Sequence, residues 1–99
     1  MSEERNRYVI AYDITNDQRR TRVHTYLKSF GMRVQYSVFL VDLKPARVLR
    51  LKTKLQSMID THEDSVLVCR VGPSADLHPK AFEYLGQSGP EPPSAAVIL

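Results

Sequence analysis

Residues 8–31 read YVIAYDITNDQRRTRVHTYLKSFG and decide the fold. Residues 8–14 are β-branched, aromatic or small and apolar, except for Asp13, which predicts a strand over 8–14. Both alternating faces of this strand are apolar, so we expect both to be covered. Asn16 and its neighbours suit the start of a helix over about 18–30. Gly31 suits a left-handed cap at the end of that helix.

The chain beyond this stretch continues the alternation. RVQYSVFLVDL, residues 33–43, exceeds a typical strand and predicts two short strands hinged near Tyr36 and Ser37. KPARVLRLKTKLQSMID, residues 44–60, has the spacing of an amphipathic helix with a proline in its first turn. DSVLVCRVG, residues 64–72, is a further strand, with Cys69 expected as a small core residue. The order βαββαβ is typical of a ferredoxin-like α+β domain, an antiparallel sheet with two helices on one face.

Two helices cover only one face of such a sheet, while its first strand is apolar on both. A second copy of the chain is the economical cover, which predicts a homodimer. Residues 77–86 suit one more short strand, and QSGPEPPS is a linker to the apolar tail AAVIL. We therefore divide the chain into a ferredoxin-like domain, residues 1–86, and a linker with a tail docked on the dimer, residues 87–99.

The composition narrows the class of protein. The 99 residues are 42% hydrophobic and 25% charged, as in globular domains. A single cysteine excludes an intrachain disulfide, no stretch is apolar enough to predict a membrane span, and residues 1–7 are too polar for a signal peptide, so we expect a cytoplasmic protein. Residues 1–72 contain 13 lysines and arginines against 8 acids, a bias that favours an anionic partner.

Asp13, at the carboxyl end of the first strand, has two interpretations. It forms an Asx-turn that helps to cap the next helix, or it holds Mg²⁺ (or Mn²⁺) beside a phosphodiester bound by nearby arginines. Those arginines are Arg19, Arg20, Arg22 and Arg33. One carboxylate is a poor metal site, and Asp17 and Asp42 lie off the strand that carries Asp13. A dimer would supply two copies of Asp13.

Five segments in order carry a family resemblance: YVIAYDI, RRTRV, GMRVQYSVFLVDL, DSVLVCRV and FEYLG. Together they resemble the small CRISPR-associated adaptation protein family, the second of the two universal adaptation proteins, over about residues 8–86. The resemblance implies a ferredoxin-like homodimer with paired aspartates at its interface. It also implies a Mg²⁺-dependent endonuclease on RNA or double-stranded DNA, or a scaffold that bridges dimers of the adaptation integrase.

The resemblance also implies roles for individual residues. Asp13 matches the catalytic metal aspartate and Tyr12 the aromatic residue before it. Arg20, Arg22 and Arg33 match basic residues, and Ser37 and Phe39 match an SVF segment with a supporting role. Leu40 stands where many members have an acid, so we assign it no role.

Three functions remain open from the sequence. The first is a metal-dependent phosphodiesterase, and the second is a non-catalytic scaffold that grips backbone phosphates. The third, an RNA-recognition module on the same topology, is disfavoured because GMRVQYSVF lacks interleaved aromatic residues for stacking bases.

Overall fold

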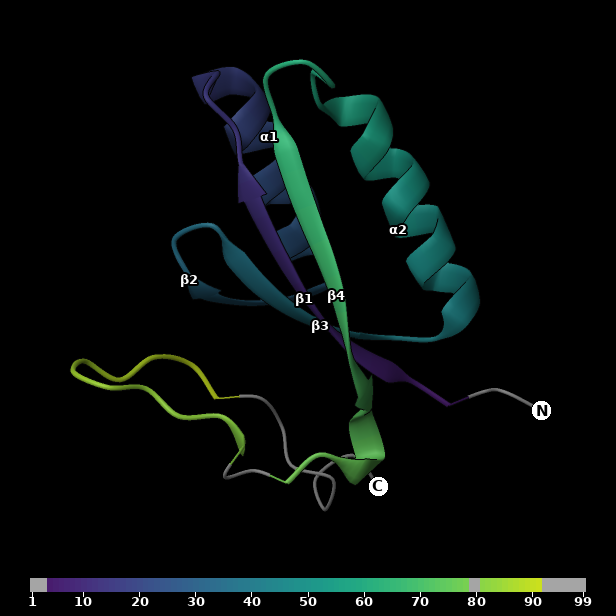
Figure 1. Ribbon diagram of the computed structural model, residues 1–99, viewed down its shortest axis with the longest axis vertical. Coiled ribbons are helices and arrows are strands. Elements are labelled where there is room, and N and C mark those ends of the chain that lie inside the picture. Colours follow the sequence, from purple (N-terminus) through teal and green to yellow (C-terminus); the bar gives the residue numbers. More distant parts are fainter. Residues whose placement is uncertain (1–3, 79–80, 92–99) are drawn as a thin grey trace.

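A computed structural model describes residues 4–78 and 81–91 of the chain (Figure 1). Its elements are β1 (Asn6–Asp13), α1 (Asp17–Lys28), β2 (Gly31–Gln35), β3 (Val38–Leu43), α2 (Pro45–Met58) and β4 (Ser65–Pro73), followed by a 3₁₀ turn at Ser74–Asp76. The strands form one antiparallel sheet in the order β2-β3-β1-β4. This arrangement confirms the predicted ferredoxin-like α+β fold and the hinge at Tyr36–Ser37.

Both helices pack on one face of the sheet, and Figure 1 shows α1 passing behind the strands. Alternate residues of β1, namely Tyr8, Ile10 and Tyr12, join the buried core with Val23 and Leu27 of α1. The apolar stripe of α2 completes this core through Val48, Leu51 and Leu55. The 3.6-residue period of the helices and the two-residue period of β1 therefore converge on a single core.

Gly31 does not cap α1. It is the first residue of β2, and only Gly72 and Gly86 have positive φ among the described residues. A Cβ atom on Gly31 would lie 2.2 Å from the carbonyl oxygen of Leu40 and 2.6 Å from Cγ1 of Val41. The glycine is therefore required by the close approach of β2 to β3, and the prediction of a left-handed cap was wrong.

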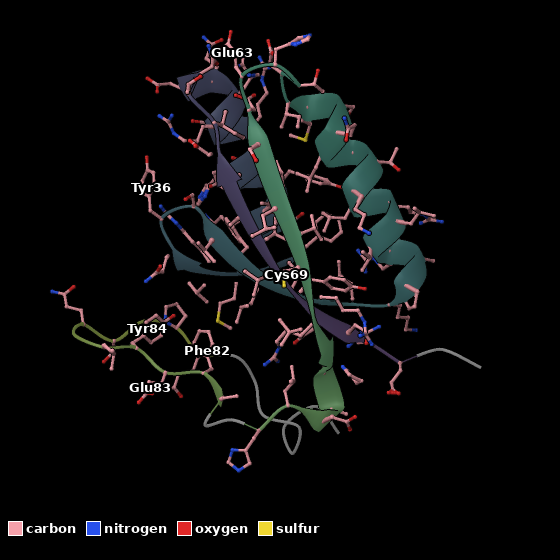
Figure 2. All side chains as sticks on the ribbon, in the orientation of Figure 1. Tyr36, Glu63, Cys69, Phe82, Glu83 and Tyr84 are labelled. Carbon is pink, nitrogen blue, oxygen red and sulfur yellow. The ribbon has the colours of Figure 1, made fainter. Side chains whose placement is uncertain are left out.

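The β1–β4 part of the opposite face of the sheet is apolar and uncovered within the described residues, whereas Leu40 of β3, which lies on the same face beside Val9, is only 7% exposed. Ala11 pairs with Leu67 and Val9 with Cys69, so these four side chains share the face opposite the core. Leu67 is 59% exposed, and Cys69 is exposed rather than part of the core. In Figure 2, Cys69 stands on the strand nearest the viewer. The expectation of a core cysteine was wrong for the single chain, because strand composition does not tell which face a partner covers.

The chain after β4 is irregular. Residues 77–78 and 81–86, where a further strand was predicted, contain none in the structure. Phe82 and Tyr84 instead pack edge to face with ring centroids 5.2 Å apart. The Tyr84 hydroxyl donates to the backbone oxygen of Pro90 at 2.7 Å, and the backbone oxygen of Val34 in β2 lies farther from it, at 3.4 Å. The apolar tail, residues 95–99, lies outside the described residues. No helix within the part of the chain described is long and apolar enough to cross a membrane.

Candidate nucleic-acid and metal site

Asp13 is the last residue of β1 and its carboxylate is exposed. It follows Val9 and Ala11 on the uncovered face, because side chains alternate along a strand. Across residues 4–78 and 81–91, the Asp13 carboxylate takes part in no hydrogen bond or ion pair. The cap of α1 comes from Asn16, whose side-chain oxygen accepts the amide of Arg19 at 2.9 Å. The structure therefore gives Asp13 no capping role.

Asp64 has the structural role at this end of the sheet. Its side chain is shielded from solvent, and its carboxylate accepts from Nε of Arg19 at 2.8 Å and from the Asp60 amide at 2.8 Å. The hydrogen bond from Arg19, joined by backbone bonds from Asp60 and Thr15, lowers the pKa of the Asp64 carboxyl against the opposing effect of burial. Sequence reasoning missed Asp64, because 45 residues separate it from Arg19.

Arg19 is consequently engaged within the fold. Besides the two bonds to Asp64, its guanidinium contacts the exposed carboxylate of Glu63 at 3.4 Å. Figure 2 shows Glu63 at the end of the molecule where α1 begins. Of the predicted nucleic-acid-binding arginines, Arg19 is thus the one whose charge is compensated by two carboxylates.

A small basic cavity lies next to the end of β1. It measures about 160 Å³ and is lined by Tyr12, Arg20, Thr21, His24, Arg33 and Tyr36. Arg20 is fixed there by a bond to the backbone oxygen of Ile14 (2.9 Å) and by an ion pair with Asp17. Arg33 donates to the backbone oxygen of Tyr36 at 3.1 Å, and its guanidinium lies 5.0 Å from the centre of the Tyr36 ring. Figure 2 shows Tyr36 at the tip of the β2–β3 turn.

Of the predicted supporting residues, Tyr12 lines this cavity, while Ser37 and Phe39 contact Tyr12 from outside its lining. The ring of Tyr12 is stacked at 6.4 Å from that of the fully buried Phe39, and His24 meets Phe39 edge-on at 5.5 Å. Ser37 accepts the Tyr12 amide through its backbone oxygen at 3.1 Å. Burial raises the pKa of the Tyr12 hydroxyl although Arg33 opposes the rise, so Tyr12 is a neutral donor. Two guanidinium groups and phenolic donors around one hollow suit a phosphate group.

The remaining candidates lie apart from this cavity. Arg22 is exposed on α1, and Asp17 pairs with Arg20. Asp42 pairs with Arg7 at the opposite end of β1. No group of three histidine, cysteine or acidic residues able to hold a metal ion occurs among the described residues. The other ligands of a metal ion at Asp13 would therefore come from outside this set of residues, as water, substrate phosphate or a second copy of the chain.

The fold and these residues define a class of protein: a small ferredoxin-like domain with an exposed carboxylate at the end of β1 and a basic cavity lined by the preceding residue, Tyr12. The family described as CRISPR associated protein Cas2 matches residues 6–77. The chain belongs to this family, as the resemblance predicted.

Relatives and solved structures agree with the match. The chain is 46% identical over 63 residues to "CRISPR-associated endoribonuclease Cas2 3" of Chloroflexus aurantiacus, covering 64% of this chain and 68% of the relative. It is 37% identical over 87 residues to "CRISPR-associated endoribonuclease Cas2 1" of Rhodospirillum rubrum, covering 88% and 84%. Hypothetical protein TT1823 of Thermus thermophilus superposes with a TM-score of 0.74 at 30% identity, covering 89% of this chain and 99% of that one. Streptococcus pyogenes Cas2 superposes with a TM-score of 0.70 at 27% identity, covering 81% and 99%.

Proposed function

We propose that this protein is a homodimeric, metal-dependent endonuclease of CRISPR adaptation that cuts RNA or double-stranded DNA in the cytoplasm. One observation carries the proposal: the Asp13 carboxylate is exposed and unpartnered within the described residues, and the residue before it, Tyr12, lines a cavity with two guanidinium groups. Carboxylates without a partner bear a free negative charge, which a divalent cation between protein and phosphate would neutralise. The endoribonuclease names of the Chloroflexus and Rhodospirillum relatives support the same activity.

The position of Asp13 supports formation of a dimer. The carboxylate lies on the same face as Val9, Ala11, Leu67 and Cys69, the apolar surface that the helices leave open. A second copy packed on this face would bury the apolar side chains and bring a second Asp13 into the same interface. The apolar surface and the incomplete metal site thus support one assembly.

The chain's own donors fit Mg²⁺, with Mn²⁺ as a substitute, better in such a dimer than in one chain, because two carboxylates then face one ion. Asp13 supplies one hard oxygen ligand from each copy, and phosphate oxygens and water would complete the shell. When bound, the metal would supply Lewis-acid stabilisation of charge at the scissile phosphate. Arg20 and Arg33 would bind phosphate oxygens in the cavity, while exposed Arg22 would extend the contact along the backbone. Arg19 would join them only by giving up its bonds to Asp64.

The decisive substitution is Asp13→Asn, which removes the charge and keeps the size of the side chain. We expect unchanged folding and loss of metal-dependent cleavage, measured on labelled RNA and duplex DNA with and without Mg²⁺ or Mn²⁺. Binding without metal should persist or tighten, because negative charge leaves a basic site. Asp76→Asn, an exposed acid in the 3₁₀ turn after β4, is the matched control and should cleave normally. Wild-type rates in Asp13→Asn would contradict the proposal.

A non-catalytic scaffold that bridges dimers of the adaptation integrase is the second candidate. It is favoured by the single carboxylate that each chain brings to the site, since phosphate binding by Arg20 and Arg33 needs no metal. Spacer integration with the partner integrase distinguishes the two. If wild type and Asp13→Asn both fail to cleave but both support integration, the scaffold function replaces the endonuclease.

A further inference from the structure

A second basic cavity lies at the end of the sheet opposite Asp13, where β3 leads into α2. It measures about 330 Å³, and its wall includes Arg5, Lys44 and Arg47 from three different parts of the chain: the residues before β1, the β3–α2 junction and the first turn of α2. The amphipathic spacing of residues 44–60 does not by itself bring the basic residues of α2 near any other basic residue. The fold instead collects one of them, Arg47, with the arginine that precedes β1.

The two arginines have hydrogen-bond donors to spare. The guanidinium of Arg47 lies 5.3 Å from the centre of the Phe30 ring, which fixes its plane and leaves its N–H edge available. Arg5 is held through its backbone oxygen, which accepts the Ser74 amide at 2.9 Å. Neither guanidinium donates a hydrogen bond to another residue of the described chain. Unpaired guanidinium groups that line one hollow are suited to bidentate binding of phosphate oxygens.

The one carboxylate in the wall, Asp42, does not cancel this charge. Arg7 donates to it through Nε at 2.8 Å and through Nη2 at 2.9 Å, and the Ser74 hydroxyl donates at 3.0 Å. Its negative charge is therefore already compensated by Arg7. Arg5 adds only a smaller electrostatic attraction to Asp42, so most of the positive charge of Arg5 and Arg47 remains available.

The start of α2 adds to the positive potential. The helix has no acidic residue in its first turn, and its N-cap residue, Lys44, makes no side-chain cap bond. The positive end of the helix dipole is thus not neutralised by a capping carboxylate. The helix end and the two arginines favour an anion at the same place.

We propose that this cavity binds a phosphate group of a nucleic-acid backbone, as a second contact remote from Asp13. Asp42 pairs across the sheet with Arg7, six residues before Asp13, so the two sites lie about 20 Å apart along β1. The proposal rests on the proposed function in so far as the ligand is a nucleic acid. A backbone held at both ends of β1 would lie in a fixed direction relative to the carboxylate.

The first test uses inorganic phosphate and the full chain labelled with ¹⁵N, without metal. We expect titration to shift the amide signals of Arg5, Arg47 and Val48 at millimolar concentrations. Arg47→Gln should reduce these shifts at least fivefold, whereas Arg50→Gln, one turn further along α2 and outside the cavity wall, should leave them unchanged. Absence of any shift at these amides overturns the cavity as a phosphate site.

The second test measures binding of a 30-base-pair duplex in EDTA, so that the result is independent of cleavage. Arg47→Gln and Arg5→Gln should each weaken the duplex at least fivefold, and Arg50→Gln, which removes the same charge, at most twofold. Arg5→Gln leaves the contact with Phe30 intact and so separates binding from folding. If phosphate shifts the cavity amides but all three variants bind duplex equally, the cavity takes free phosphate and the nucleic-acid assignment is overturned. A failure of the cleavage test with Asp13→Asn would change neither readout.

Discussion

Two carboxylates lie next to each other at one end of the sheet and have opposite environments. Asp13 pairs across the strands with Ser65, the residue that follows Asp64. Asp64 has no exposed side-chain surface and is satisfied by Arg19 and backbone amides, whereas Asp13 is exposed and has no partner within the described residues. A satisfied buried carboxylate stabilises a loop, and an unsatisfied exposed one is available for a ligand.

Asp64→Asn should destabilise the fold, because it removes the charge that Arg19 neutralises and leaves a donor where an acceptor stood. The pKa of Asp64 is lowered in the folded state, so its stabilisation is complete above the unfolded pKa of about 3.9 and is lost as pH falls through the folded value. Melting curves from pH 7 to pH 2 should show a lower midpoint for the variant at neutral pH and a smaller further loss in acid.

The control for this prediction is Glu63→Gln, which changes an exposed carboxylate with a 3.4 Å contact to the same arginine. It should melt within a degree or two of the wild type, as expected of a surface ion pair. Equal melting midpoints for all three proteins at neutral pH would show that Asp64 does not tie α1 to the loop before β4.

At the scale of elements, periodicity identified both helices and all four strands, including the break at Tyr36–Ser37. What it could not identify depends on contacts between distant residues. A glycine after a helix predicts a left-handed cap. At position 31, however, glycine is required because the backbone carbonyl of Leu40 leaves no room for a side chain. The aromatic residues of 81–86 read as strand formers, yet Phe82 and Tyr84 pack on each other outside the sheet. Likewise, Asp13 could be predicted because a polar residue ends an apolar strand. The basic cavity could not, because its wall joins residues that are distant in the sequence.

Gly31→Ala tests the contact that displaced the cap interpretation. The added methyl group would meet the Leu40 carbonyl and Val41 at distances no packed atoms tolerate, so β2 must move away from β3. We expect a loss of about 2 kcal/mol or more in the free energy of unfolding, measured by urea denaturation. Gly86→Ala is the comparison: its φ is +86° but nothing lies within 4 Å, so it should disturb only the segment after β4. A stable Gly31→Ala protein would place β2 farther from β3 than the structure does.

For the whole molecule, the predicted dimer can be tested with two exposed leucines, one on the uncovered sheet face and one on α2. Leu67 on the uncovered face is 59% exposed, and Leu49 on the outer side of α2 is 66% exposed. Leu67→Glu should weaken self-association at least tenfold, because each dimer would bury two negative charges in its interface. Leu49→Glu makes the same chemical change elsewhere and should leave the association constant within twofold.

Sedimentation at a series of concentrations measures both variants against the wild type. We expect the wild type to be dimeric at micromolar concentration. A wild-type protein that stays monomeric well above this range, or equal effects of the two substitutions, would show that the Leu67 face is not where copies meet.

The Tyr84 side chain beside the Val34 carbonyl has a consequence for how sheets of this protein can aggregate. β2 and β4 are the outer strands, and continuous growth of a fibre needs a free backbone row on each. β2 is five residues long and irregular between Arg33 and Gln35, and the Tyr84 side chain lies against its Val34 carbonyl, with the hydroxyl at 3.4 Å. β4 is nine residues long, and no strand of the described chain pairs along its outer side. The two outer edges therefore differ: β4 offers a long row of backbone groups to an added strand, whereas the short, irregular β2 offers a poor one, which disfavours end-to-end growth of one sheet through both edges.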